Sequence, residues 1–155
     1  AKKLYGASTP VSIIATDIDT DVLQEAKEGI YTIDFKIEKF PNWFEMEEYF
    51  TPLDDGKNPN VRLLKAKDKL KSMITFKQMN LFDKRYPFMR EEFDMLFCRN
   101  VLIYFKQEDQ QEILSRLIDT LRIDGTFYLG HSESLYHLTE KFEKLGNKTF
   151  VKIKA

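Results

Sequence analysis

The chain has 155 residues, of which 43% are hydrophobic and 32% charged, a composition typical of one globular domain with a buried core. Its 24 basic and 25 acidic residues give a formal charge of -1, so no basic excess is available for general nucleic-acid binding. One cysteine excludes an internal disulfide, and with only two histidines besides we expect no metal site. No apolar run approaches the roughly 20 residues of a membrane helix, so we predict a soluble, cytoplasmic domain without direct membrane insertion.

The N-terminal part of the chain predicts a strand, a loop and a helix. Val11 to Ala15 (VSIIA) is a β-branched run typical of a buried strand. A polar segment follows, in which Asp19 or Thr20 can cap a helix over residues 21–28, and Gly29 ends that helix. This arrangement is half of a βαβ unit.

Residues 30–78 have a different character and are interpreted as an insertion. Asn42 to Phe50 predicts a short helix in which Trp43 serves packing. Turn-forming residues then separate short alternating runs (TPLDDGKNPNV). The runs predict a small antiparallel set of three strands: Phe50–Leu53, Val61–Ala66 and Met73–Gln78.

The C-terminal half predicts strands alternating with a helix. The helix has one apolar stripe and is expected to end at Gly125. The predicted elements are a strand at Phe93–Cys98, a helix at Gln107–Leu121, a strand at Thr126–Leu129, and a hairpin of Phe142–Leu145 with Thr149–Ile153. The alternation favours a mostly parallel α/β sheet, to which the hairpin adds an antiparallel edge.

Polar residues follow four of the predicted strands. They are Asp17 and Asp19, Asn80, the pair Arg99 and Asn100, and the segment Gly130–Ser134. In open α/β sheets, ligands bind beyond the carboxyl ends of the strands. Their concurrence at four strand ends therefore favours a ligand-binding edge.

Each of these residues also has a purely structural interpretation. Asp19 can be a helix cap, Asn80 a turn residue, and Arg99 the partner of an ion pair. His131 can be a hydrogen-bonding strut, and Tyr104 lies in an apolar run that suits a core. These alternatives remain open at the level of single residues.

Five motifs taken together resemble those of the CheR-type chemotaxis receptor methyltransferases. They are ATDID (15–19), GIY (29–31), NLF (80–82), FCRNVLIYF (97–105) and GHSES (130–134), in the order found in that family. The resemblance extends from about Ser12 to the C-terminus. It implies a Rossmann-like S-adenosylmethionine methyltransferase sheet of strand order 3-2-1-4-5-7-6, with a small inserted antiparallel β-subdomain and a C-terminal antiparallel hairpin.

The resemblance also implies an activity and partners. The activity is methylation of glutamate side chains on the cytoplasmic domains of methyl-accepting chemotaxis receptors, with S-adenosyl-L-methionine as cofactor and S-adenosyl-L-homocysteine as product. Such a reaction belongs to chemotactic signal transduction. The absence of an obvious nucleophile and base does not argue against an enzyme, because a carboxylate needs alignment rather than deprotonation.

The motif match assigns expected roles to individual residues. Asp17 is expected to contact the cofactor ribose, and Asn80 and Leu81 to line the adenine pocket. Arg99 and Asn100 are expected beside the cofactor. Tyr104 is expected close to the transferred methyl, so Arg99 and Tyr104 are the predicted catalytic residues.

The sequence departs from the family in two places. The Gly-rich cofactor loop and the first strand are expected before Ala1, and Ala1–Tyr5 resemble the end of the helix that follows that loop. We therefore expect residues 1–155 to be a methyltransferase domain fragment that binds cofactor weakly or not at all and does not methylate alone. Its exposed sheet edges make a strand-exchanged dimer possible. The turn after Phe50 has one glycine, Gly56, so we expect the insertion to contact receptors otherwise than through a C-terminal peptide.

Two other functions are compatible with the fold. A non-catalytic methyltransferase-like module could sense the cofactor or dock on a signalling partner. A small-molecule methyltransferase is a third possibility, but GHSES and the β insertion argue against it.

Overall fold

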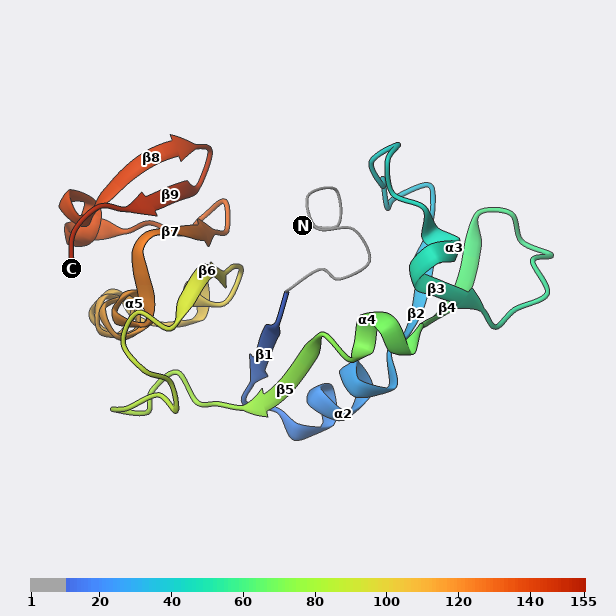
Figure 1. Cartoon of the computed structure of the whole chain (residues 1–155), viewed down its shortest axis with the longest axis horizontal. Helices are drawn as coiled ribbons and strands as arrows, with labels where there is room; N and C mark the ends of the chain where they lie inside the picture. The colour runs from blue at the N-terminus through green and yellow to red at the C-terminus, as the bar shows by residue number, and fades with distance from the viewer. Residues whose placement is uncertain (1–10) are drawn as a thin grey trace. The chain divides into compact units, whose positions relative to one another are not determined.

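A computed structural model describes residues 11–155 of the chain (Figure 1). The predicted helix end at Ala1–Tyr5 lies outside the described residues. The chain forms two compact units, Ala1–Asn80 and Leu81–Ala155, and each is described by itself. Within the described part, no helix is both long and apolar enough to cross a membrane.

The first unit contains a parallel strand pair with one helix. β1 (Ile13–Asp17) pairs with β5 (Ile74–Gln78) in parallel register, from Ile13 opposite Ile74 to Asp17 opposite Gln78. The helix α2 (Thr20–Glu28) follows β1. Asp19 caps its start by accepting the N–H groups of Asp21 (2.8 Å) and Val22 (3.3 Å), and Gly29 ends it in the left-handed conformation (φ 68°). The predicted helix and both of its caps are confirmed.

The same unit carries an antiparallel sheet of order β2-β4-β3. Its strands are β2 (Ile30–Asp34), β4 (Val61–Ala66) and β3 (Phe50–Pro52), and a short helix α4 (Asp68–Lys71) follows β4. The prediction that Met73–Gln78 belongs to this antiparallel set is wrong, because β5 pairs in parallel with β1. An alternating pattern indicates a half-buried strand, but it does not identify the strand with which it pairs. The strand β2, in which Ile30 and Tyr31 are exposed, was not predicted.

The helix expected at Asn42–Phe50 is reduced to α3 (Met46–Tyr49). Phe44 packs there as the centre of an aromatic stack, with ring centroids 5.2 Å from Phe40 and 5.4 Å from Tyr49. Trp43 lies outside α3 and is 79% exposed, so the predicted packing role of Trp43 is wrong. The neighbouring Phe44, instead of Trp43, packs between aromatic rings next to α3.

The second unit contains a four-stranded sheet of order β6-β7-β9-β8. Its strands are β6 (Phe93–Cys98), β7 (Leu121–Leu129), β8 (Phe142–Gly146) and β9 (Thr149–Lys152). β6 and β7 are parallel and are connected through α5 (Gln107–Thr120), whereas the β8–β9 hairpin joins β7 in antiparallel fashion. Two 3-10 turns, η1 (Leu102–Tyr104) and η2 (Tyr136–Lys141), complete the unit. The mixed α/β class and the C-terminal hairpin are therefore confirmed.

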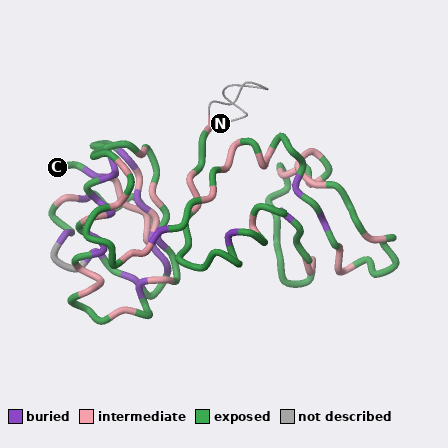
Figure 2. The backbone as a smooth tube through the Cα atoms, turned by 90° about the horizontal axis from the view of Figure 1, so that it is seen from below, coloured by how far each residue is buried: buried purple, intermediate pink, exposed green. Residues whose placement is uncertain are grey.

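The core of the second unit lies between α5 and the sheet. The predicted apolar stripe of α5 is buried, and Figure 2 shows purple segments concentrated in the C-terminal part of the chain. Buried members include Ile113, Leu114, Ile118, Phe127 and Leu129. Because each such side chain contributes about 1.5–3 kcal/mol when fully buried, this cluster dominates the stability of the unit.

The end of α5 differs from the prediction. The helix ends at Thr120, and Gly125 lies inside β7 instead of ending the helix. The buried side chain of Lys152 donates from Nζ to the carbonyl oxygens of Ile118 (3.0 Å) and Leu121 (2.6 Å), which are end carbonyls of the helix. A lysine on β9 therefore provides the capping that the sequence suggested for a local glycine.

Candidate functional site

In the first unit, Asp17 and Asn80 lie at the neighbouring carboxyl ends of the paired strands β1 and β5. Asp17 is the last residue of β1, and its carbonyl oxygen accepts the N–H of Met79 (2.9 Å), the residue before Asn80. The side chain of Asp17 is exposed, and its Oδ1 accepts the N–H of Asp19 (3.0 Å). Because a carboxylate accepts several hydrogen bonds, Asp17 can accept others from a ligand.

The second unit places Arg99, Asn100 and Tyr104 after β6. Arg99 and Asn100 follow Cys98 directly and are exposed, and Asn100 has the left-handed conformation (φ 60°). Tyr104 ends η1 and is 81% exposed, so the alternative that it belongs to the core is wrong. In the run from Val101 to Phe105, only Leu102 is fully buried.

Sequence reasoning missed the role of Glu133 in the segment after β7. This carboxylate is 1% exposed and accepts three backbone N–H groups. Oε1 accepts those of Val101 (3.0 Å) and Leu102 (2.9 Å), and Oε2 accepts that of Gly130 (2.6 Å). The N–H of Glu133 in turn donates to the carbonyl of Gly130 (3.2 Å), a reciprocal pair like that of a capping box. The Gly-x-x-Glu spacing was the available signal for the local half of this arrangement.

Gly130 allows the two segments to approach closely. A Cβ atom at this position would lie 2.7 Å from Oδ1 of Asn100 and 2.6 Å from Oε2 of Glu133. Such distances are too short for any side chain, so the segments after β6 and β7 can contact one another only if this residue is glycine. His131 and Ser132, between Gly130 and Glu133, are exposed.

Leu81 is fixed within the second unit by its backbone and side chain. Its side chain packs against the α5 core, and its carbonyl oxygen accepts the Tyr86 hydroxyl (2.8 Å) and the Arg116 guanidinium (3.2 Å). Burial raises the pKa of Tyr86, which keeps this hydroxyl a donor at neutral pH. The expectation that Leu81 lines an adenine pocket stays a prediction.

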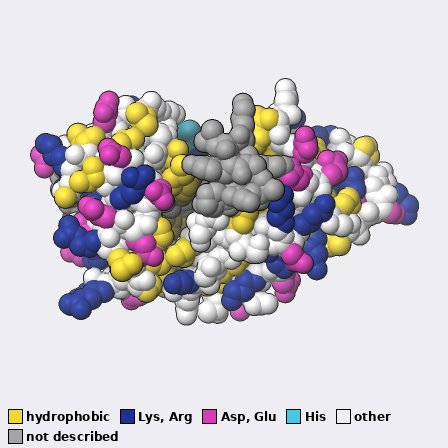
Figure 3. Space-filling model, viewed as in Figure 1, with side chains coloured by type: hydrophobic (Ala, Val, Ile, Leu, Met, Phe, Trp, Pro, Cys, Tyr) yellow, Lys and Arg dark blue, Asp and Glu magenta, His cyan; other side chains and the backbone are white. Residues whose placement is uncertain are grey.

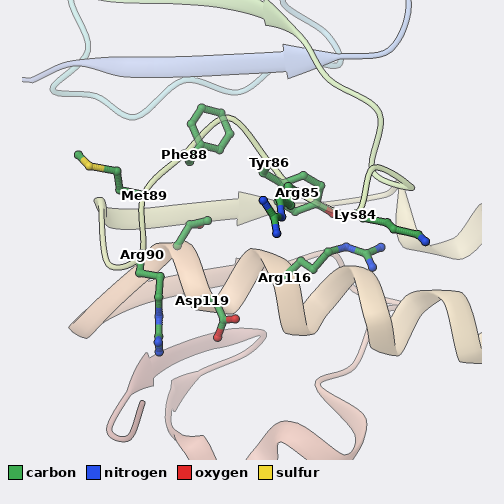
Figure 4. A pocket seen from close by; sticks show the side chains of 9 residues that line it. Lys84, Arg85, Tyr86, Phe88, Met89, Arg90, Arg116 and Asp119 are labelled. Atoms are coloured by element: carbon green, nitrogen blue, oxygen red, sulfur yellow. The ribbon is translucent and has the colours of Figure 1, made fainter.

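A shallow hollow of about 240 Å³ lies between residues 84–90 and α5 (Figure 4). Its lining is mainly basic and aromatic, and includes Lys84, Arg85, Tyr86, Arg90 and Arg116. None of the predicted site residues lines it, so this hollow is separate from the strand-end residues. Basic and acidic side chains are interspersed on the face shown in Figure 3, in keeping with the near-zero net charge.

Side chains with hydrogen-bonding groups lie at or after strand ends in each unit: Asp17 and Asn80 in the first, and Asn100 in the second. An exposed carboxylate such as Asp17 can accept two hydroxyl hydrogen bonds, and the carboxamides of Asn80 and Asn100 can both donate and accept. Burial, with a smaller effect of Glu133, raises the pKa of the Cys98 thiol to about 12. Cys98 is therefore a neutral thiol at physiological pH and is not a nucleophile for this site.

The chain is a mixed α/β protein with polar residues at the carboxyl ends of parallel strands in each unit, and sequence comparison identifies its family. The family described as "CheR methyltransferase, SAM binding domain" matches residues 1–151. The chain belongs to this family, whose domain takes S-adenosylmethionine as cofactor.

Several curated proteins are similar to the chain over most of its length. A "Chemotaxis protein methyltransferase" of Escherichia coli (strain K12) is 37% identical over 138 residues, which are 89% of this chain and 46% of that protein. A protein of the same name from Borreliella burgdorferi is 38% identical over 125 residues, 81% of this chain and 41% of that protein. "Chemotaxis protein methyltransferase 2" of Pseudomonas aeruginosa is 33% identical over 141 residues, 91% of this chain and 48% of that protein. The chain thus spans about half the length of the curated relatives that it matches.

Proposed function

We propose that this chain is the cofactor-binding and catalytic part of a cytoplasmic protein-glutamate O-methyltransferase that acts on chemotaxis receptors. Its family membership and the names of its relatives support the reaction class. The observation that carries the proposal is the placement of the family's motif residues at the carboxyl ends of parallel strands in both units. The carboxyl ends of parallel strands are where α/β sheets bind their ligands.

The strand pairing supports the methyltransferase sheet implied by the motifs. In the first unit β5 and β1 correspond to strands 3 and 2 of the expected order. In the second unit the order β6-β7-β9-β8 corresponds to strands 4, 5, 7 and 6. We propose residues 1–155 as a methyltransferase domain and residues 30–78 as its insertion.

The residues of the chain would divide the work of binding and alignment. Asp17 accepts hydrogen bonds from the ribose hydroxyls, and Asn80 and Leu81 flank the adenine. Arg99 and Asn100 lie beside the cofactor, and Tyr104 lies near the methyl group. When bound, the cofactor supplies a methyl group on a sulfonium, which leaves as a neutral thioether.

No residue of the chain has to remove a proton in this reaction. A receptor glutamate is already ionised at neutral pH, and one of its oxygens forms the bond to the methyl carbon as the carbon–sulfur bond breaks. The electron pair of that bond goes to sulfur, and the products are a methyl ester and S-adenosylhomocysteine. Alignment of reacting groups is worth up to about 7–11 kcal/mol, so positioning by Arg99 and Tyr104 is the main catalytic contribution.

The antiparallel insertion is proposed to contact receptors otherwise than by binding a C-terminal peptide. Its long turn is held by Asp54, which accepts Nε of Arg62 (2.7 Å), the N–H of Gly56 (3.2 Å) and the N–H of Leu63. These bonds, led by that from Leu63, hold the pKa of Asp54 below its usual value. A turn closed by its own carboxylate, with Gly56 as its one glycine, has few backbone groups free for an incoming strand.

The test of the proposed function is cofactor binding and receptor methylation by the native gene product that carries this sequence. Asp17→Asn is compared with Asp21→Asn, which makes the same change at an exposed residue in the first turn of α2. Hydrogen bonds to charged groups are worth about 1.5–3 kcal/mol, so we expect S-adenosylhomocysteine to bind Asp17→Asn roughly 10- to 100-fold more weakly. The control should bind normally.

Two results would contradict the proposal. If the wild-type protein binds no S-adenosylhomocysteine in calorimetry, the cofactor-binding assignment is wrong. If it binds but transfers no labelled methyl group to receptor glutamates, the chain belongs to a non-catalytic, cofactor-sensing module instead.

A further inference from the structure

We propose that Glu133 is a positioning residue that holds the Arg99–Tyr104 segment in the conformation needed for cofactor binding and methyl transfer. The inference rests on the proposed function, and it adds a residue for which the motif match gives no role. Glu133 comes from the segment after β7, whereas the predicted catalytic residues follow β6.

Glu133 acts as the missing cap of η1. Val101 is the residue that begins this turn, and its own side chain forms no capping hydrogen bond. The first N–H groups of a helical turn have no partner within the turn, so they need an outside acceptor. Oε1 of Glu133 accepts the N–H groups of both Val101 (3.0 Å) and Leu102 (2.9 Å), and thus satisfies two of them from 32 and 31 residues away.

These bonds are strong because the carboxylate is buried. Glu133 is 1% exposed, and an ionised acceptor in such surroundings forms shorter and stronger hydrogen bonds than a neutral one. Lys148 also fixes the backbone of Glu133, because its ammonium group donates to the Glu133 carbonyl oxygen. Glu133 is therefore held at its backbone by Lys148 and at its carboxylate by the turn that it caps.

The capped turn controls the residues on either side of it. Tyr104 is the last residue of η1, and its N–H donates to the carbonyl of Val101 (3.3 Å). Asn100, just before the turn, has a left-handed backbone (φ 60°) and lies against Gly130, with no space for a Cβ between them. Without the bonds to Glu133, the turn would be anchored by the buried side chain of Leu102 but not by its backbone, and the backbone directions at Arg99 and Tyr104 would no longer be fixed.

The contacts of Glu133 differ from those that build the core of the unit. Its carboxylate bonds to the backbone of two loop segments, whereas α5 and β7 are held by apolar packing around Phe127 and Ile118. A change of charge at Glu133 can therefore loosen the loops while the core persists.

The test uses Glu133→Gln in the native gene product, with Glu143→Gln as the matched control on the exposed surface of β8. The carboxamide keeps the size of the side chain but replaces one acceptor oxygen with an NH₂ group. Both oxygens of Glu133 accept backbone N–H groups, so the NH₂ group of glutamine would meet another donor in either orientation. We expect the amide hydrogens of Val101, Leu102 and Gly130 to exchange at least 10-fold faster, while those of Phe127 and Ile118 stay protected.

Cofactor affinity provides the second measurement. We expect Glu133→Gln to bind S-adenosylhomocysteine about 10-fold more weakly, with unchanged stoichiometry in calorimetry, and kcat for receptor methylation to fall by a similar or larger factor. A purely structural role would instead lower the fraction of competent protein, and hence the stoichiometry, at unchanged affinity. Gly130→Ala should reproduce the weaker binding, because a methyl group there would lie 2.6 Å from Oε2 of Glu133 and must push the same two segments apart, although the side chain of Glu133 keeps its charge.

The outcomes distinguish this inference from the proposed function. Faster loop exchange with unchanged affinity and kcat would overturn the positioning role, as would unchanged exchange in Glu133→Gln. If the wild-type protein itself binds no S-adenosylhomocysteine, the proposed function fails, and with it the role of Glu133 in cofactor binding. If Glu133→Gln does not fold, Gly130→Ala decides by the same exchange and affinity measurements.

Discussion

Lys152 Nζ lies 2.6 Å from the carbonyl oxygen of Leu121 and 3.0 Å from that of Ile118, so a buried lysine on β9 caps the end of α5. Lysine is almost never fully buried unless its ammonium group is paired. Here the pairing is with carbonyl groups at the negative end of a helix, where a cation is favourable. The hairpin and the helix are thereby connected by a polar contact inside the core.

Removing this cap should destabilise the protein. Lys152→Met keeps most of the apolar stem but removes the ammonium donor from both carbonyls, and the carbonyl of Ile118 then keeps only the N–H of Leu121. A buried polar group that loses its partner costs about 1–3 kcal/mol. We expect the free energy of unfolding to fall by about 1–3 kcal/mol in urea denaturation, with Lys144→Met on the exposed face of β8 close to wild type. A loss below about 0.5 kcal/mol would mean that the cap contributes little.

The same lysine predicts a pH dependence. Burial lowers the pKa of Lys152 from its usual 10.5, so the unfolded chain binds this proton more tightly than the folded protein does. Stability attributable to Lys152 should therefore rise with pH between the lowered pKa and 10.5. The measurement is the difference in unfolding free energy between wild type and Lys152→Met from pH 7 upward. A difference that shrinks with rising pH would contradict the expected direction.

Two glycines should respond very differently to alanine. At Gly125 a new Cβ would lie 2.6 Å from Cδ1 of Leu121 and 2.8 Å from the carbonyl oxygen of Arg122, whereas at Gly146 nothing lies within 4 Å. Overpacking costs about 1–3 kcal/mol, so Gly125→Ala should lower the free energy of unfolding by that amount. Gly146→Ala should stay within about 0.5 kcal/mol of wild type. Equal effects in thermal or urea unfolding would show that the strand adapts without strain.

Cys98 should be unreactive in the folded protein. Burial raises the pKa of its thiol to about 12, so very little thiolate is present at neutral pH. Only 5% of the residue is exposed, so a reagent has little access to the sulfur. We expect reaction with a disulfide reagent at pH 8 to be at least about 100-fold slower in buffer than in denaturant. Rapid labelling of the native protein would contradict the burial of this residue at the end of β6.

Trp43 should report a water-exposed environment although the protein is folded. It is the single tryptophan and is 79% exposed, so its emission maximum and its quenching by acrylamide should change little on unfolding. Trp43→Phe should change the free energy of unfolding by less than about 0.5 kcal/mol. A blue-shifted emission that moves strongly to the red in denaturant would instead indicate packing of the indole.

The strand-end positions of the candidate residues could be predicted because they depend on local sequence. Strand ends rich in polar residues located Asp17, Asn80, Arg99 and Asn100, and the structure places all four directly at or after parallel strands. The role of Glu133 could not be predicted in the same way. Two of its three acceptor bonds reach residues 31 and 32 positions away, and no short-range pattern reports such a distance.

The sequence by itself determined the elements whose hydrogen bonds and packing are local. Asp19 and Gly29 delimit α2 through bonds within four residues, and the apolar stripe of α5 follows directly from its helical period. Only the tertiary structure decided that β5 pairs with β1, that Lys152 ends α5, and that Glu133 caps η1. In each of these three cases the partner lies more than 30 residues away, so the chain must fold before the bond that defines the feature can form.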